Sequence, residues 1–150
     1  MSSKPITREQ YIAKLEEDEG KKIEKISAFG NILNHCSRFR EEKISTLDEF
    51  RRLFWCPKGP TGPHDEIDKL SNNTRNIGAI LESAREDLDQ CPKAYFEDRE
   101  PVGPKRCFFL IEAGGRKEIY NGNHRAGGII RKILQGSEFK EITSYVGVIE

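Results

Sequence analysis

The sequence predicts an α+β fold in which a helical N-terminal region precedes a small mixed sheet. Apolar residues recur at helical spacing through residues 7–90. A short continuous apolar run, residues 107–111, then marks a change to strand-like composition, and residues 142–149 repeat that composition. Since 150 residues is the length of one domain, we expect a single domain, 1–150. It would comprise an N-terminal helical extension, residues 1–43, and a core, residues 44–150.

The charge balance and hydropathy exclude some classes of partner. The chain has 25 Lys and Arg against 25 Asp and Glu, whereas tight sequence-independent binding to duplex DNA depends on a surplus of clustered basic residues. No apolar run approaches the ~18 residues of a membrane span, and the first 20 residues hold no apolar run typical of a signal peptide. We therefore expect a cytoplasmic protein with no membrane partner.

The first helix is predicted to begin at a capping box. Thr7 and Gln10 have the spacing at which a hydroxyl and an amide satisfy each other's free backbone donors. Apolar residues continue at helical spacing through residues 23–36, which indicates a second helix or one bent helix. The acidic run at residues 16–19 is interpreted as a solvated face.

A second capping box, Thr46 to Glu49, predicts a short helix. Its apolar residues are expected to face the core: Leu47, Phe50, Leu53 and Phe54. Residues 57–63 are rich in proline and glycine and therefore form a loop. Apolar spacing within residues 65–90 predicts two further helices, the second capped by Thr74.

The C-terminal third is predicted to hold the sheet. Residues 107–111 and 117–120 read as the strands of a hairpin joined through residues 113–115. Helical spacing follows over residues 126–134, and a last strand is expected within residues 142–149.

The turn at residues 120–128 is the segment whose residues carry chemistry. A turn that opens directly into a helix leaves backbone N–H groups without intrahelical partners, and the helix dipole reinforces their attraction for anions. Gly122 allows a ligand to approach the backbone, and Arg125 adds a permanent charge with geometry suited to phosphate. His124 can donate a hydrogen bond or transfer a proton. The pattern therefore predicts a phosphate-binding turn.

A purely structural interpretation fits the same residues. Asn121–Gly122 is also an ordinary tight-turn dipeptide, and Asn123 can act as a helix cap. The Arg125 guanidinium can form an ion pair with Glu112 or Glu118. The two interpretations stay open at this point.

The stretch FFLIEAGGRKEIYNGNHRAGGIIRKILQG, residues 108–136, with ITSYVGVI, residues 142–149, resembles the core of the ParB/sulfiredoxin-like superfamily. In that superfamily a strand delivers a Gly-x-His-Arg or Gly-x-Arg-Arg turn to a helix N-terminus, commonly after an Asp. Members include CTP-binding partition proteins, ATP-using sulfinic acid reductases, small-molecule kinases and proposed nucleases.

The resemblance implies that this turn binds a nucleotide, ATP or CTP, with Mg²⁺ as a further cofactor. The residues that fall on or beside the phosphate-contacting turn are Tyr120, Asn121, Gly122, Asn123, His124 and Arg125. Sulfiredoxins have Cys where Asn123 stands here, so the peroxiredoxin-repair reaction is not expected. The frequent leading Asp is Asn121, which removes a potential metal ligand or base.

Two function hypotheses follow. In the first, the protein is a phosphotransferase or a hydrolase of nucleotides or phosphodiesters: Arg125 stabilises phosphate charge, His124 acts as acid or donor, and a carboxylate, Glu112 or Glu118, holds Mg²⁺ or serves as base. In the second, it is a non-catalytic module that binds a nucleotide or DNA and engages a protein partner through its N-terminal helices. A third interpretation makes the chain a helical interaction protein whose hairpin is structural.

Overall fold

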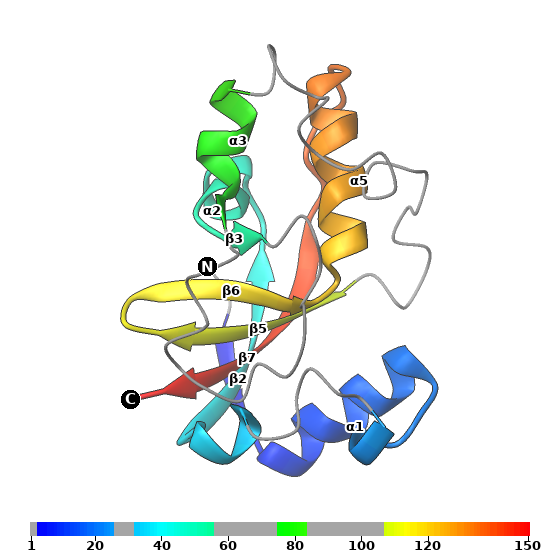
Figure 1. Ribbon diagram of the computed structural model, residues 1–150, viewed down its shortest axis with the longest axis vertical. Coiled ribbons are helices and arrows are strands. Elements are labelled where there is room, and N and C mark those ends of the chain that lie inside the picture. Colours follow the sequence, from blue (N-terminus) through cyan, green and yellow to red (C-terminus); the bar gives the residue numbers. More distant parts are fainter. Residues whose placement is uncertain (1–2, 26–31, 56–74, 84–106) are drawn as a thin grey trace.

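The computed structural model describes residues 3–25, 32–55, 75–83 and 107–150. These residues form an α+β structure (Figure 1). The strands are β1 (Ser3–Ile6), β2 (Arg38–Ile44), β3 (Phe54–Trp55), β4 (Arg75–Asn76), β5 (Cys107–Ala113), β6 (Arg116–Asn121) and β7 (Ile142–Ile149). The α-helices are α1 (Arg8–Glu19), α2 (Leu47–Arg51), α3 (Ile77–Ser83) and α5 (Asn123–Leu134), with short 3₁₀ helices at Ile23–Lys25 and Ile32–His35.

The strands form one mixed sheet in the order β1-β2-β7-β5-β6-β3-β4. Five of them have four or more residues, while β3 and β4 have two each. Strands β5 and β7 pair in parallel, as do β3 and β6, and the other neighbours are antiparallel. The last strand of the chain therefore lies inside the sheet, between β2 and β5.

Each face of the sheet packs against its own helices. Figure 1 shows α2, α3 and α5 grouped together, away from α1. One core joins α2, α3 and α5 to the sheet through residues such as Phe50, Phe108 and Ile130. The other core buries Tyr11 and Leu15 of α1 against the opposite face, because side chains of a strand point alternately to the two faces.

The predicted helical character of the first half is only partly correct. Strands β1 and β2 belong to the sheet, and the expected boundary between residues 43 and 44 falls inside β2. Residues 23–25 and 32–35 form separate 3₁₀ turns where α-helical spacing was expected. The N-terminal region is therefore part of the sheet domain, because β2 pairs with β7 along seven residue positions.

The local start signals for helices are confirmed. The Thr7 hydroxyl accepts from the Gln10 amide at 3.0 Å, and the Gln10 side chain accepts from the Thr7 amide at 2.8 Å. Thr46 caps α2 through the Glu49 amide at 3.1 Å. Leu47, however, is 38% exposed rather than inward-facing, since it lies in the first turn of that short helix.

The remaining predictions in the middle of the chain are tested only in part. Helix α3 falls within the predicted helical segment 65–90, whereas the expected loop at residues 57–63 and the cap at Thr74 lie outside the described residues. Among the described residues, no helix has the length and apolar character needed to cross a membrane.

Candidate functional site: the turn between β6 and α5

A single glycine connects β6 to α5. Gly122 has φ of 110°, a left-handed conformation that side chains strongly disfavour. A Cβ at this position would lie 2.6 Å from Cδ1 of Phe108, so Phe108 would have to shift to admit a larger residue. Gly122 is the N-cap residue of α5 and, as a glycine, supplies no capping side chain. The strand, turn and helix predicted around this glycine are therefore present.

Arg125 in the first turn of α5 is held by the protein itself. One terminal nitrogen donates to both carboxylate oxygens of Asp18, at 2.8 and 3.0 Å, and the other donates to the Cys107 carbonyl at 3.0 Å. The Asp18 side chain is only 3% exposed and that of Arg125 is 21% exposed. The ion-pair partners considered from sequence, Glu112 and Glu118, are thus wrong, because the carboxylate comes from α1.

Several hydrogen-bond donors surround the carboxylate of Asp18. The Asn121 amide donates to it at 3.0 Å, and the Cys107 thiol lies 3.7 Å from its Oδ1 atom. Burial, together with the nearby negative charge of Asp18, raises the pKa of the Cys107 thiol to about 12. The acidic run at residues 16–19 is therefore not simply a solvated face, since Asp18 turns inward.

The other residues predicted to contact a ligand have different placements. Tyr120 is 6% exposed and packs in the core beneath α1, where burial raises the pKa of its hydroxyl well above the usual value. Tyr120 is consequently a core residue and not a surface residue that contacts a ligand. The side chains of Asn123 and His124 lie outside the described part of the structure.

Glu112 is not brought to the turn. It stands five residues beyond Cys107 on β5, about 16 Å along an extended strand, while the Cys107 carbonyl is the group that contacts Arg125. Its carboxylate pairs with both terminal nitrogens of Arg40, at 2.7 and 3.3 Å. These hydrogen bonds lower the pKa of Glu112. Glu112 is therefore part of another cluster.

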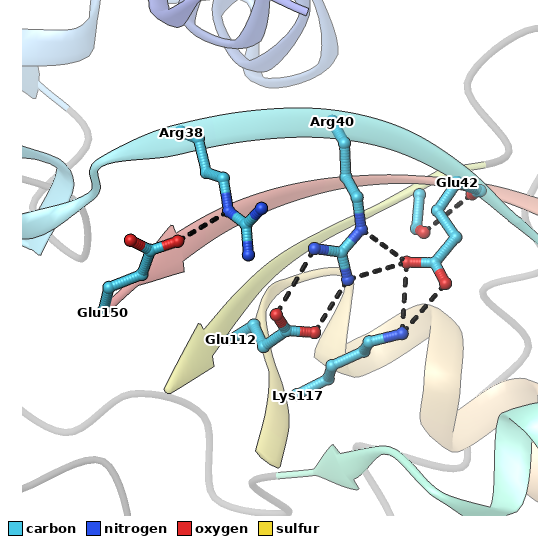
Figure 2. Close-up of polar contacts among 7 residues, drawn as sticks. Arg38, Arg40, Glu42, Glu112, Lys117 and Glu150 are labelled. Carbon is cyan, nitrogen blue, oxygen red and sulfur yellow. Dashed lines mark hydrogen bonds and ion pairs between the residues drawn. The ribbon is translucent and has the colours of Figure 1, made fainter. Parts of the chain in front are cut away.

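Figure 2 shows that second cluster, which crosses the face of the sheet. Arg40 on β2 also contacts the Glu42 carboxylate at 3.1 Å, and Lys117 on β6 bonds both oxygens of Glu42, at 2.9 and 3.1 Å. Arg38 pairs with Glu150 at 2.8 Å at the end of the same group. Sequence reasoning missed this network because Glu112, Lys117 and Glu150 reach the charged residues of β2 only in the folded sheet.

No protein-family model, curated protein or solved structure matches the chain. The chemistry of the turn must then follow from its own residues. The N-terminus of α5 presents backbone donors at the positive end of the helix dipole, while the charge of Arg125 is balanced by Asp18. Within the described residues, no group of three or more His, Cys, Asp or Glu side chains is arranged to hold a metal ion.

Proposed function

We propose that the protein binds a phosphate-bearing small molecule, a nucleotide such as ATP or CTP, at the turn formed by Gly122 to Arg125. The observation that carries the proposal is the N-terminus of α5, whose N-cap residue is a left-handed glycine that supplies no capping side chain. Such a terminus attracts anions through its backbone donors. The choice of a nucleotide rests on the resemblance to the ParB/sulfiredoxin-like superfamily, which stays part of the proposal.

Arg125 contributes less to ligand binding in this proposal than the sequence predicted. Because Asp18 neutralises its charge and fixes its position, Arg125 does not supply a full positive charge to a ligand. The backbone amides of the turn supply most of the attraction, and the exposed fraction of the guanidinium contributes a directed donor. We therefore expect modest affinity for phosphate groups.

Binding is better supported than catalysis. The carboxylate assigned to catalysis from sequence, Glu112, is engaged by Arg40 at a distance from the turn. The carboxylate that does lie at the turn, Asp18, is engaged by Arg125 and Asn121. Phosphoryl transfer or hydrolysis, with His124 as acid, remains a prediction that product analysis tests, as does a role for Mg²⁺.

The experiment is a thermal-shift screen of the whole chain with the four common nucleoside triphosphates and inorganic pyrophosphate, each with and without Mg²⁺. A ligand that binds only the folded state raises Tm by mass action. Arg125→Ala is a poor test variant, because it would leave Asp18 buried without its partner. Asn123→Asp is preferable, since an acid in the first turn suits the helix dipole yet repels phosphate.

The control is Asn34→Asp, which adds the same charge at an exposed position beside Arg8. We expect at least one nucleotide to raise Tm in the wild type and in Asn34→Asp but not in Asn123→Asp. A panel in which no phosphate ligand changes Tm would overturn the proposal. Release of phosphate by the wild type would show that the protein hydrolyses the nucleotide as well as binding it.

A further inference from the structure

A chemically reactive dipeptide lies at the junction of β6 and α5. Asn121–Gly122 is the only Asn-Gly pair among the 150 residues of the sequence. In such a pair the glycine nitrogen can attack the side-chain carbonyl carbon of the asparagine, because glycine has no Cβ to hinder the approach. Ammonia leaves, formed from the side-chain NH₂ group and the proton that the glycine nitrogen loses. Water then opens the resulting cyclic imide to aspartate or isoaspartate.

The folded structure holds the Asn121 amide away from this reaction. Its nitrogen donates to Oδ2 of Asp18 at 3.0 Å, and a carboxylate only accepts hydrogen bonds, so the NH₂ group must face it. The backbone of Asn121 pairs with Phe109 at the end of β6. Closure of the imide ring requires the side chain to leave Asp18 and fold back on Gly122. The reaction therefore proceeds from a locally opened state.

The aspartate product does not fit the contacts around Asp18. Arg125 already donates from one terminal nitrogen to both oxygens of Asp18, at 2.8 and 3.0 Å. A carboxylate at position 121 places a second acceptor where the amide donor stands, and one guanidinium then faces two carboxylates. The Asp18 side chain is only 3% exposed, so water screens this repulsion poorly. The contact between α1 and the turn therefore requires an amide at position 121.

The isoaspartate product does not fit the backbone of the turn. It routes the main chain through the side chain and so adds one carbon atom to it. Gly122 is the single residue between β6 and α5, its carbonyl accepts from the Ala126 amide at 2.8 Å, and it lies close against Phe108. A connection this short has no loop that could absorb the extra atom. Both products therefore disturb the same junction.

We propose that Asn121 is a site of spontaneous deamidation, and that its conversion irreversibly breaks the contact between α1 and the turn. Opening of this contact exposes Asn121 to the reaction, and the new carboxylate then prevents the contact from forming again. The fraction of deamidated protein thus increases with the time that α1 has spent away from the turn. This proposal does not depend on ligand binding at the turn.

The first experiment measures the rate of the reaction. The whole protein is incubated at pH 8 in buffer and in urea, and mass spectrometry of its peptides follows Asn121. We expect deamidation to be at least about tenfold slower in buffer. Asp18→Ala, kept below its Tm, should increase the rate in buffer at least about threefold, because the Asn121 amide loses its acceptor. Glu17→Ala, at the exposed neighbouring position, is the control and should leave the rate unchanged.

The second experiment measures the effect of the product. Asn121→Asp should lower Tm by at least about 6 °C, since it places two carboxylates beside one arginine. In an Asp18→Asn background the same substitution should no longer lower Tm, because the site again holds one carboxylate.

Four results would overturn the proposal, two from each experiment. In the rate measurement they are equal deamidation of Asn121 in buffer and in urea, and a wild-type rate in Asp18→Ala. In the stability measurement they are a wild-type Tm for Asn121→Asp, and an equal loss of Tm from Asn121→Asp with Asp18 or with asparagine at position 18.

Discussion

The carboxylate of Asp18, in the last turn of α1, receives two hydrogen bonds from the guanidinium of Arg125, in the first turn of α5, across 107 positions of sequence. This ion pair joins the helix on one face of the sheet to the turn that opens the helix on the other face. It makes the N-terminal helix a structural support of the candidate ligand site.

Replacing Asp18 with alanine should lower the free energy of unfolding by about 3 kcal/mol, because the largely buried Arg125 and Asn121 lose their shared acceptor. Urea denaturation at pH 7 measures this change. Glu17→Ala is the control: Glu17 is the exposed neighbour in the same helix, and its loss should alter stability by less than about 0.5 kcal/mol. Equal effects of the two substitutions would contradict a stabilising role for the pair.

Gly122→Ala should destabilise the protein more than Gly136→Ala. Both glycines have positive φ, 110° and 96°, so each alanine brings backbone strain of about 1 kcal/mol. Only at Gly122 does the new Cβ meet a neighbour, Phe108, which adds about 1–3 kcal/mol for overpacking. Thermal unfolding of both variants makes the comparison, and similar losses would show that Phe108 moves aside freely.

Glu112→Gln should have a pH-dependent effect on stability. Arg40 lowers the pKa of Glu112 in the folded state below its unfolded value of ~4.3. The ion pair therefore stabilises the protein above that value, and the contribution is lost as pH falls through the folded-state pKa. We expect the wild type to have a higher Tm than Glu112→Gln at pH 7, and the difference to shrink as pH falls below the unfolded value of ~4.3.

The same substitution made in an Arg40→Gln background is the control for the Glu112 prediction. Without the guanidinium, the hydrogen bonds that lower the pKa of Glu112 are gone. The pH-dependent difference in Tm between the Arg40→Gln single variant and the Arg40→Gln, Glu112→Gln double variant should then become smaller, with Lys117 and Arg38 as the remaining charges that lower the pKa of Glu112. An undiminished difference would show that Arg40 is not the main cause of the lowered pKa.

The thiols of Cys36 and Cys107 should react slowly in the folded protein. Burial raises their pKa to about 11 and about 12, and the thiolate is the nucleophilic form. In a variant with Cys56 and Cys91 replaced by serine, an aromatic disulfide reagent at pH 8 should label the two thiols much faster in urea than in buffer. Rapid labelling of the folded chain would contradict this prediction.

The features predicted correctly from sequence are those encoded by neighbouring residues. The capping box at Thr7 needs only Gln10, three positions away. The hairpin and the helix after Gly122 follow from a change of apolar period and from glycines at the turns. Each of these signals is contained in a short stretch of neighbouring residues.

The features that sequence reasoning missed depend on distant partners. Strand β2, with the sequence RFREEKI, is so rich in charge that it is typical of a solvated segment. Its Arg40 and Glu42 are nevertheless largely buried, because Glu112 and Lys117 from other strands neutralise them. Asp18 was missed for the same reason, since nothing in an acidic run shows which of its carboxylates has an arginine across the sheet.

The position of β7 has a consequence for how the chain acquires its structure during synthesis. Strand β2, complete by Ile44, pairs along its inner edge with β7, which ends at Ile149. A ribosome therefore releases β2 long before the strand that separates it from β5 has been made. The sheet closes only after about a hundred further residues have been translated, and such non-local pairing slows folding. Until β7 is complete, β2 and β5 each keep one unpaired edge, and the high charge of β2 disfavours edge-to-edge association during that interval.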